Sequence, residues 1–308
     1  MGDGEGSYME QLSLLKEQLD RLCPEMELRE NEPLSKHTSF HIGGPCALMA
    51  LPATTQEAAQ AIKAACELGI KPFFMGNGSN LLVPDEGTER FIVKTSMLRS
   101  IERLGTRLIA QAGVTLARLA VFARDENLTG LEFAHGIPGT LGGAVTMNAG
   151  AYGGEMAQVV RRVVLLTDQG ERIETTEFDF GYRHSAFEDG SRMILEVELE
   201  LNDGDCVDIG SRMDDLALQR QSKQPLEYPS AGSMFKRPEG YFAAALIDQC
   251  GLKGLRVGGA QVSEKHAGFV VNRGGATCED VLELVRKVKD HVMSDTGVEL
   301  EMEVKILA

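Results

Sequence analysis

Two glycine-rich segments carry the residue types that most directly indicate chemistry. The first is Gly76-Asn77-Gly78-Ser79-Asn80-Leu81, which follows a short apolar run at residues 72–75. Glycine lets backbone N–H groups approach an anion closely, and successive N–H groups form a concave site for phosphate oxygens. The segment lacks the third glycine of the Rossmann pattern. Taken alone, so short a pattern is more typical of a plain surface turn.

The second segment, residues 136–154, is more specific. It contains Gly139-Thr140-Leu141-Gly142-Gly143-Ala144, and Asn148 and Gly150 follow. Because every glycine costs backbone entropy in a packed helix or strand, we expect an irregular loop that wraps a large flat or phosphorylated ligand. The interleaved apolar side chains argue against a disordered linker. Two such segments in one chain indicate a dinucleotide held between two lobes.

Five motifs in a fixed order connect these segments to one enzyme family. They are Thr38-Ser39-Phe40 with Gly43-Gly44, the segments at 76–82 and 136–155, Tyr182-Arg183, and the run PSAGSMFKRP at 229–238. In these motifs the chain resembles the UDP-N-acetylenolpyruvoylglucosamine reductases (UDP-N-acetylmuramate dehydrogenases), flavoproteins of bacterial peptidoglycan precursor synthesis. The resemblance runs from about residue 33 to the end of the chain. It implies non-covalently bound FAD, NADPH as the hydride donor, and UDP-N-acetylglucosamine enolpyruvate as the acceptor.

The spacing after Arg183 indicates which form of the family the chain resembles. Only about ten residues separate Arg183 from the strand predicted at Met193, too few for an extra substrate-clamping loop. The chain therefore resembles the shorter form. The alternative function is that of an FAD-dependent alcohol or sugar oxidase or dehydrogenase of the wider flavin family, and a non-enzymatic flavin-binding module is a third option. The pair Ser233 and Glu303 disfavours the oxidase, because alcohol oxidation has no use for it.

The resemblance implies three catalytic residues. Arg183 would hold the substrate carboxylate, since a guanidinium stays charged and binds carboxylates with two hydrogen bonds. Ser233 would deliver a proton to the enolic carbon. Glu303 would assist the enolic carboxylate or orient Ser233 and water. Glu301 stays the alternative to Glu303, because both lie on one face of a strand predicted at residues 298–306.

The resemblance also implies the binding residues. For the cofactor they are Gly76, Asn77, Gly78, Ser79, Asn80, Leu81, Gly139, Thr140, Gly142, Gly143, Ala144, Asn148, Gly150 and, at the flavin edge, Arg220. For the substrate they are Tyr182, Lys236, Lys265 and His266, of which the last three are cations for the uridine diphosphate. As single residues, these cations are as typical of a solvated surface as of a binding site.

Hydrophobic periodicity predicts the elements that must position these residues. Leu12, Leu15, Leu19 and Leu22 share one face of a helix, whereas residues 1–8 are expected to be unstructured, since Met9 could itself be the start. Thr54 and Glu57 form a capping box for the next helix. Further helices are expected at 116–124, 208–222, 242–250 and after Thr277. Strands are expected at 72–75, 91–94, 107–112, 159–167, 172–176, 193–201 and 298–306.

These elements predict an α+β protein. We expect an N-terminal segment and helix at 1–32 and a two-lobed FAD-binding domain of the vanillyl-alcohol-oxidase (PCMH) type at 33–203. Its lobes would be divided near residue 95, and a smaller α+β substrate-binding domain would occupy 204–308. The last strand could return to the FAD lobe.

Composition excludes several classes of function. The chain has 308 residues and a net charge of −15, which disfavours nucleic-acid or anionic-membrane partners, because both require clustered cations. No apolar run approaches the roughly 20 residues of a membrane span, and no signal peptide is evident. The six cysteines and six histidines show no metal-ligand spacing. We therefore expect a cytoplasmic protein with small-molecule partners and no metal.

Overall fold

The computed structural model describes residues 3–307, and their side chains from Tyr8 onward. The chain forms two compact units. Unit 1 comprises the chain up to Glu32 with Cys46–Asn77 and Glu89–Leu218, and unit 2 comprises Pro33–Pro45, Gly78–Thr88 and the chain from Gln219. Each unit draws on distant parts of the sequence, unlike the contiguous domains expected at 33–203 and 204–308. The division of function between those domains stays a prediction.

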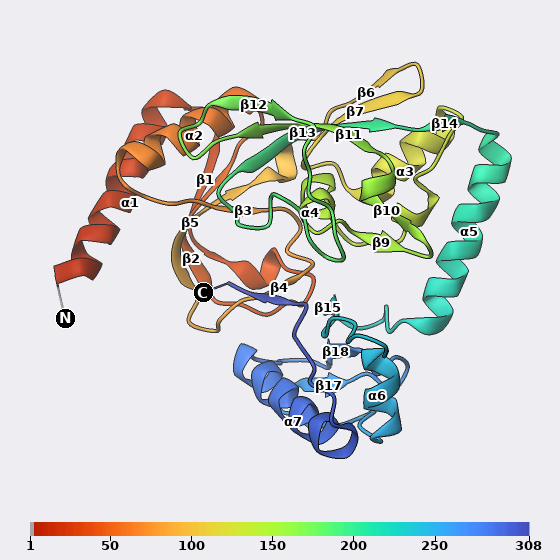
Figure 1. Cartoon of the computed structure of the whole chain (residues 1–308). Coiled ribbons are helices and arrows are strands. Elements are labelled where there is room, and N and C mark those ends of the chain that lie inside the picture. The colour runs from red at the N-terminus through yellow and green to blue at the C-terminus, as the bar shows by residue number, and fades with distance from the viewer. Residues whose placement is uncertain (1–2, 308) are drawn as a thin grey trace. The chain divides into compact units, whose positions relative to one another are not determined.

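Two helices and a four-stranded sheet form one part of unit 1. The helices α1 (Asp3–Leu22) and α2 (Thr55–Glu67) lie side by side (Figure 1). The sheet has the order β1 (Glu27–Pro33), β2 (Pro45–Leu51), β5 (Thr88–Lys94), β3 (Phe73–Met75). As the capping box predicts, α2 begins where Thr54 Oγ1 accepts a hydrogen bond of 3.1 Å from the Glu57 backbone N–H. Strand β3 pairs in parallel with β5 and leads directly into Gly76.

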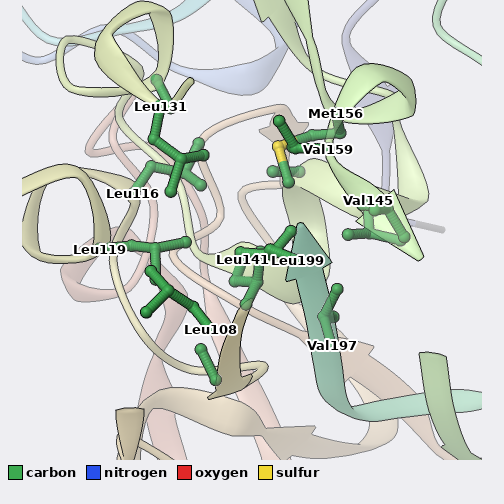
Figure 2. Close-up of a cluster of buried hydrophobic side chains, with 14 of the residues drawn as sticks. Leu108, Leu116, Leu119, Leu131, Leu141, Val145, Met156, Val159, Val197 and Leu199 are labelled. Carbon is green, nitrogen blue, oxygen red and sulfur yellow. The ribbon is translucent and has the colours of Figure 1, made fainter. Parts of the chain in front are cut away.

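A five-stranded antiparallel sheet forms the other part of unit 1. Its order is β12 (Arg172–Thr175), β11 (Val160–Leu166), β13 (Met193–Glu200), β7 (Arg107–Gln111), β6 (Ile101–Leu104). The helices α3 (Leu116–Asp125) and α4 (Leu141–Thr146) contribute to its buried face. Figure 2 shows strand residues Leu108 and Leu199 beside Leu141 in this cluster. The sheet thereby fixes α4 and the glycine-rich residues that flank it.

A bulge lets β13 bury both of its faces. The register passes from Leu165↔Ile194 to Val164↔Glu196, so Leu195 is the extra residue. As a result Leu195 belongs to the buried cluster of α1 and α2, whereas Val197, only two residues later, belongs to the cluster of α3 and α4. Strict alternation along residues 193–201 does not predict this change of face.

Shorter elements complete unit 1. They are η2 (Thr95–Met97), β8 (Leu128–Thr129), η3 (Glu132–Ala134), β9 (Gly150–Ala151), β10 (Gly154–Glu155), η4 (Met156–Gln158) and β14 (Asn202–Asp203). The long helix α5 (Cys206–Lys223) begins in unit 1 and ends in unit 2.

Unit 2 is built on a four-stranded sheet of order β15 (Ser230–Ser233), β18 (Phe269–Asn272), β17 (Ala260–Val262), β16 (Arg256–Val257). Helices α6 (Ala243–Gln249) and α7 (Cys278–Thr296) pack with it, and η1 (Leu34–Lys36) precedes them in the chain. The apolar face of α7, with Val281, Leu284, Val285, Val288 and Val292, is buried. Strand β19 (Lys305–Ile306) pairs in parallel with β4 (Leu81–Leu82).

Four predictions about these elements are wrong. Residues 3–8 belong to α1 instead of being unstructured, whereas residues 1–2 lie outside the described part. Leu22 is 53% exposed, because the buried stripe of α1 continues to Cys23. The final strand is reduced to β19, because between residues 298 and 304 only an isolated bridge at Met302 finds a backbone partner. The glycine-rich segment contains the helix α4, in which Leu141, Ala144 and Val145 supply a buried face at helical spacing.

Candidate active site

The two glycine-rich segments converge on the side chain of Thr140. A Cβ atom at Gly76 would collide with Thr140 Oγ1, and one at Gly143 would lie 3.6 Å from the same oxygen. Hydrogen bonds from Leu141 N–H to the Val114 carbonyl and from Leu116 N–H to the Gly139 carbonyl hold the segment around Thr140 beside residues 114–116. Three residues expected to bind the cofactor therefore surround one hydroxyl group.

The hydroxyl of Thr140 is buried and has no hydrogen-bond partner within the described part of the chain. Thr140 is the N-cap residue of α4, yet its side chain makes no capping bond. A buried polar group left without a partner costs about 1–3 kcal/mol, so such a group is usually completed by a ligand or water. Gly143 beside it is exposed and has room for a Cβ, so the packing of the protein itself does not require a glycine there. These residues fit a bound FAD that approaches the backbone closely.

Several other predicted cofactor residues serve the protein's own packing. Gly142 lies against Ala112 of the neighbouring chain segment, and Ala144 is part of the buried core. A Cβ at Gly150 would lie 2.7 Å from the Gly154 carbonyl oxygen, which explains a glycine in that hairpin. Asn148 is 3% exposed, and both of its side-chain polar atoms bond to protein backbone.

Tyr182 and Arg183 occupy a tight turn in unit 1. The turn is closed by a bridge between Gly181 and His184. Arg183 has a φ of 53°, and its guanidinium carbon lies 5.4 Å from the centre of the Tyr182 ring. Hydrogen bonds to Glu188 and Asp179 raise the pKa of His184 above its usual value, since they stabilise the protonated imidazole. The turn is thus a defined structure that carries the Arg183 guanidinium beside the Tyr182 ring.

Ser233 and Glu303 are brought close through the backbone of unit 2. Strand β15 ends at Ser233, and the Glu303 backbone N–H donates a 2.9 Å hydrogen bond to the carbonyl of Met234. Gly232 has a φ of 79° with no atom near its missing Cβ, so its backbone conformation, and not lack of space, favours glycine there. This left-handed residue bends β15 immediately before the serine. Both Ser233 and Glu303 are half-buried.

Lys236 pairs with the alternative carboxylate. Its ammonium group lies 2.5 Å from Glu301 Oε1, and its backbone N–H bonds to the Glu301 carbonyl. The Glu301 side chain is 73% exposed. Of the two carboxylates, Glu303 therefore lies nearer to Ser233 along the paired backbone, whereas Glu301 faces solvent beside a lysine.

The remaining cations lie on other segments of unit 2. Lys265 donates a 2.6 Å hydrogen bond to the Gln221 carbonyl, at the end of the helix that also carries Arg220. Burial lowers the pKa of His266, and its Nδ1 accepts a hydrogen bond from the Gly268 N–H. Burial thus favours the neutral imidazole, in which Nε2 carries the proton because Nδ1 accepts the Gly268 hydrogen bond.

The sequence does not predict that Asn80 contacts Glu303. Asn80 Nδ2 donates a 3.3 Å hydrogen bond to the Glu303 carbonyl, and the Asn80 carbonyl accepts one from the Lys305 N–H. Gly78, Ser79 and Leu81 belong to the same unit as Glu303, whereas Asn77 belongs to unit 1. No local pattern signals this pairing, because the partners are 223 residues apart.

Comparison with known proteins identifies the family. Residues 46–176 match the model of an FAD binding domain, and residues 224–307 match that of the UDP-N-acetylenolpyruvoylglucosamine reductase C-terminal domain. The UDP-N-acetylenolpyruvoylglucosamine reductase of Alkaliphilus oremlandii is 48% identical over 94% of this chain and 96% of its own length. The chain belongs to this reductase family. A second reductase, from Caldanaerobacter subterraneus, is 45% identical over 96% of this chain and 98% of its own length.

A solved reductase has the same fold. The UDP-N-acetylenolpyruvylglucosamine reductase of Thermus caldophilus superposes with a TM-score of 0.80 at 36% identity, covering 92% of this chain and 100% of that one. The chain is thus an FAD-dependent oxidoreductase of the predicted α+β class, and the resemblance seen in its motifs is confirmed. The residues that act in this reductase stay predictions.

Among residues 3–307, no helix is long and apolar enough to cross a membrane. The described residues also contain no cluster of three His, Cys, Asp or Glu side chains that could hold a metal ion.

Proposed function

We propose that this reductase uses NADPH to reduce UDP-N-acetylglucosamine enolpyruvate to UDP-N-acetylmuramate. The observation that carries the proposal is the hydrogen bond from Glu303 N–H to the Met234 carbonyl, which brings a carboxylate residue beside the Ser233 segment. Both residues lie within the match to the reductase C-terminal domain. Relatives at 45–48% identity carry the name of this activity.

The reaction requires a hydride donor, stabilisation of the developing charge and a proton for C2 of the enolpyruvyl group. When bound, FAD supplies the hydride that it has taken from NADPH. The protein would hold it through Gly76, Thr140 and Gly143, whose arrangement leaves a hydroxyl without a partner and backbone without side chains. Charged and polar side chains would stabilise the developing charge and supply the proton for C2.

Arg183 is suited to hold the substrate carboxylate. Charge spreads onto this carboxylate as hydride reaches the neighbouring carbon, so a guanidinium in place before the reaction lowers the barrier. The left-handed backbone of Arg183 supports this role, because strained residues are often found where function requires a fixed side chain.

Ser233 is suited to deliver the proton to C2. A serine hydroxyl is a weak acid, but an enolic carbon that carries negative charge is a strong acceptor. Glu303 would orient the Ser233 hydroxyl, or a water molecule that restores its proton. The proton that Ser233 gives to C2 is replaced from this water, which regains it from the solvent, so the proton balance closes with Glu303 unchanged in charge.

We also propose the binding partners and location. Tyr182, Lys236 and Lys265 are the candidates for the nucleotide sugar, with His266 as a neutral donor. The net charge of −15 opposes nucleic acid and anionic membranes as partners. A cytoplasmic location is supported by the six cysteines, which are free thiols in the described structure, as is typical of a reducing compartment.

An anaerobic flavin spectrum tests the function. The purified holoprotein is mixed with NADPH, and the visible absorbance of the oxidised flavin is expected to bleach. Addition of UDP-N-acetylglucosamine enolpyruvate should restore the absorbance in step with formation of UDP-N-acetylmuramate. UDP-N-acetylglucosamine, which lacks the enolpyruvyl group, is the control. Absorbance that returns only on admission of oxygen would contradict the proposal.

A further inference from the structure

The turn that carries Arg183 holds a conformation that needs support. A φ of 53° is unfavourable for a residue with a side chain, and such residues persist only where their surroundings fix them. The bridge across the turn consists of two hydrogen bonds between Gly181 and His184, of 3.1 and 3.3 Å. The His184 ring is itself exposed and bonds to the exposed Asp179 and the half-buried Glu188, so solvent competes with both bonds. Buried anchors must therefore supply the remaining support.

Asn148 is the first buried anchor. Its Nδ2 donates a 3.0 Å hydrogen bond to the carbonyl of Gly181, two residues before Arg183. Its Oδ1 accepts a 2.9 Å hydrogen bond from the Ala157 N–H, so the amide group cannot turn without losing both contacts. The side chain is 3% exposed and its own φ is 41°, a conformation that Asn tolerates better than most residues. Asn148 thus connects the Arg183 turn to the backbone at Ala157 through its two side-chain hydrogen bonds.

Ser185 is the second buried anchor. Its Oγ donates a 2.7 Å hydrogen bond to the carbonyl of Thr146, the last residue of α4, and accepts one from the Phe187 N–H. Ser185 is 1% exposed. Both anchors therefore tie the Arg183 turn to the chain between Thr140 and Asn148, the same segment whose beginning fits the cofactor.

We propose that Asn148 is a positioning residue for Arg183 instead of a ligand of the cofactor. Through Asn148 and Ser185, the cofactor-binding segment sets the place of the guanidinium that holds the substrate carboxylate. The consequence for catalysis rests on the proposed function of Arg183, whereas the anchoring itself does not. Arg183 would then be in place for the acceptor and would play no part when NADPH delivers its hydride.

The isosteric variant Asn148→Asp isolates the proposed contact. A carboxylate keeps the acceptor for Ala157 N–H but cannot donate to the Gly181 carbonyl, and Asp tolerates the left-handed backbone. Asn127→Asp is the matched control, since Asn127 also has a left-handed φ of 59° and uses its Oδ1 as an acceptor, from the Cys206 N–H. The variant Ser185→Ala tests the same turn from its other anchor if Asn148→Asp does not fold.

Hydrogen exchange of the holoprotein provides the first measurement. Amides of peptides that cover residues 181–187 should exchange faster in Asn148→Asp, and those of the same peptides should be unchanged in Asn127→Asp. Unchanged exchange of this peptide in both Asn148→Asp and Ser185→Ala would overturn the anchoring, whatever the enzyme's activity.

Stopped-flow kinetics provides the second measurement. Bleaching of the flavin by NADPH should keep its rate in Asn148→Asp, whereas recovery with the enolpyruvyl nucleotide should slow about 10- to 100-fold, as expected for a misplaced binding group. In an Arg183→Ala background, Asn148→Asp should slow the recovery no further, because the two residues act as one. If the fold-slowing of the double variant equals the product of the two single effects, the residues act independently and the inference is overturned. If Arg183→Ala alone leaves the recovery unchanged, the proposed role of Arg183 fails, and the exchange data still decide the anchoring.

Discussion

At the scale of one residue, a substitution of Gly143 should have opposite effects on the stability of the fold and on the affinity for FAD. It is exposed in α4 and has room for a Cβ, so Gly143→Ala should stabilise the cofactor-free protein by up to about 1 kcal/mol through helix propensity. The same methyl group should weaken FAD binding, because it lies beside the Thr140 hydroxyl. Urea unfolding of the apoprotein and titration with FAD measure the two effects.

Gly142→Ala is the matched control for this prediction. Its Cβ would lie 2.9 Å from the Ala112 Cβ in the buried core, so we expect a loss of about 1–3 kcal/mol in the free energy of unfolding. A Gly143→Ala protein that binds FAD as tightly as the unchanged chain would show that the segment does not approach the cofactor.

Ser233→Ala should divide the reaction into its halves. Bleaching of the flavin by NADPH needs no proton from Ser233 and should keep its rate. Recovery with the enolpyruvyl nucleotide should slow about 10²–10⁴-fold, the usual contribution of a general acid, with little change in substrate affinity. Stopped-flow absorbance resolves the two phases. Equal slowing of both phases would mean that Ser233 positions the flavin and is not the proton donor.

At the scale of elements, sequence patterns predicted the helix starts that are determined by residues close together in the chain. The predicted capping box at Thr54 sets the first turn of α2. The helix expected after Thr277 likewise begins at a capping box and buries its apolar face. The strand expected at 298–306 fails because alternation reports burial and not a continuous hydrogen-bonding partner. Strand β4 pairs only with residues 305–306, and Met302 forms an isolated bridge with Phe235. Helix α4 was not predicted, because the many glycines of its segment indicated a loop even though Leu141, Ala144 and Val145 have helical spacing.

Strand β5 places a buried lysine that should make stability depend on pH. Lys94 is 8% exposed, and burial, aided by Arg29, lowers its pKa to about 8, while Glu32 acts in the opposite direction. Between about pH 8 and the ordinary pKa of about 10.4, the unfolded chain holds more protons than the folded one, so this group's contribution to stability rises with pH. Below about pH 8 its buried charge opposes folding.

The variant Lys94→Met tests this dependence. We expect it to unfold at a higher urea concentration than the unchanged chain at pH 7, and this advantage should shrink at pH 10. Lys63→Met, which changes an exposed lysine of α2, is the control for the loss of one charge. An advantage of the same size at both pH values would contradict the assigned pKa.

At the scale of the whole molecule, the sequence order of the motifs predicted the family but not the compact units. Unit 2 recruits Pro33–Pro45 and Gly78–Thr88 through contacts with residues far along the chain. Asp85, for example, accepts hydrogen bonds from the N–H groups of Cys278 and Glu279 at the start of α7. Ser39 Oγ donates to the Ser230 carbonyl at a separation of 191 residues. Such pairings depend on the finished fold and leave no local pattern in the sequence.

The stability of the whole chain should depend on a flavin that is held without a covalent bond. The segments at 76–82 and 136–155 contain neither cysteine nor histidine, the side chains that most often attach a flavin. Acid precipitation should therefore leave intact FAD in the supernatant, whereas flavin that stays with the precipitate would contradict this.

Because FAD binds the folded state, free FAD at 100 times its Kd should stabilise the apoprotein by about 2.7 kcal/mol and raise its melting temperature. Gly143→Ala should show a smaller rise at the same FAD concentration, since its affinity is lower while its fold is retained.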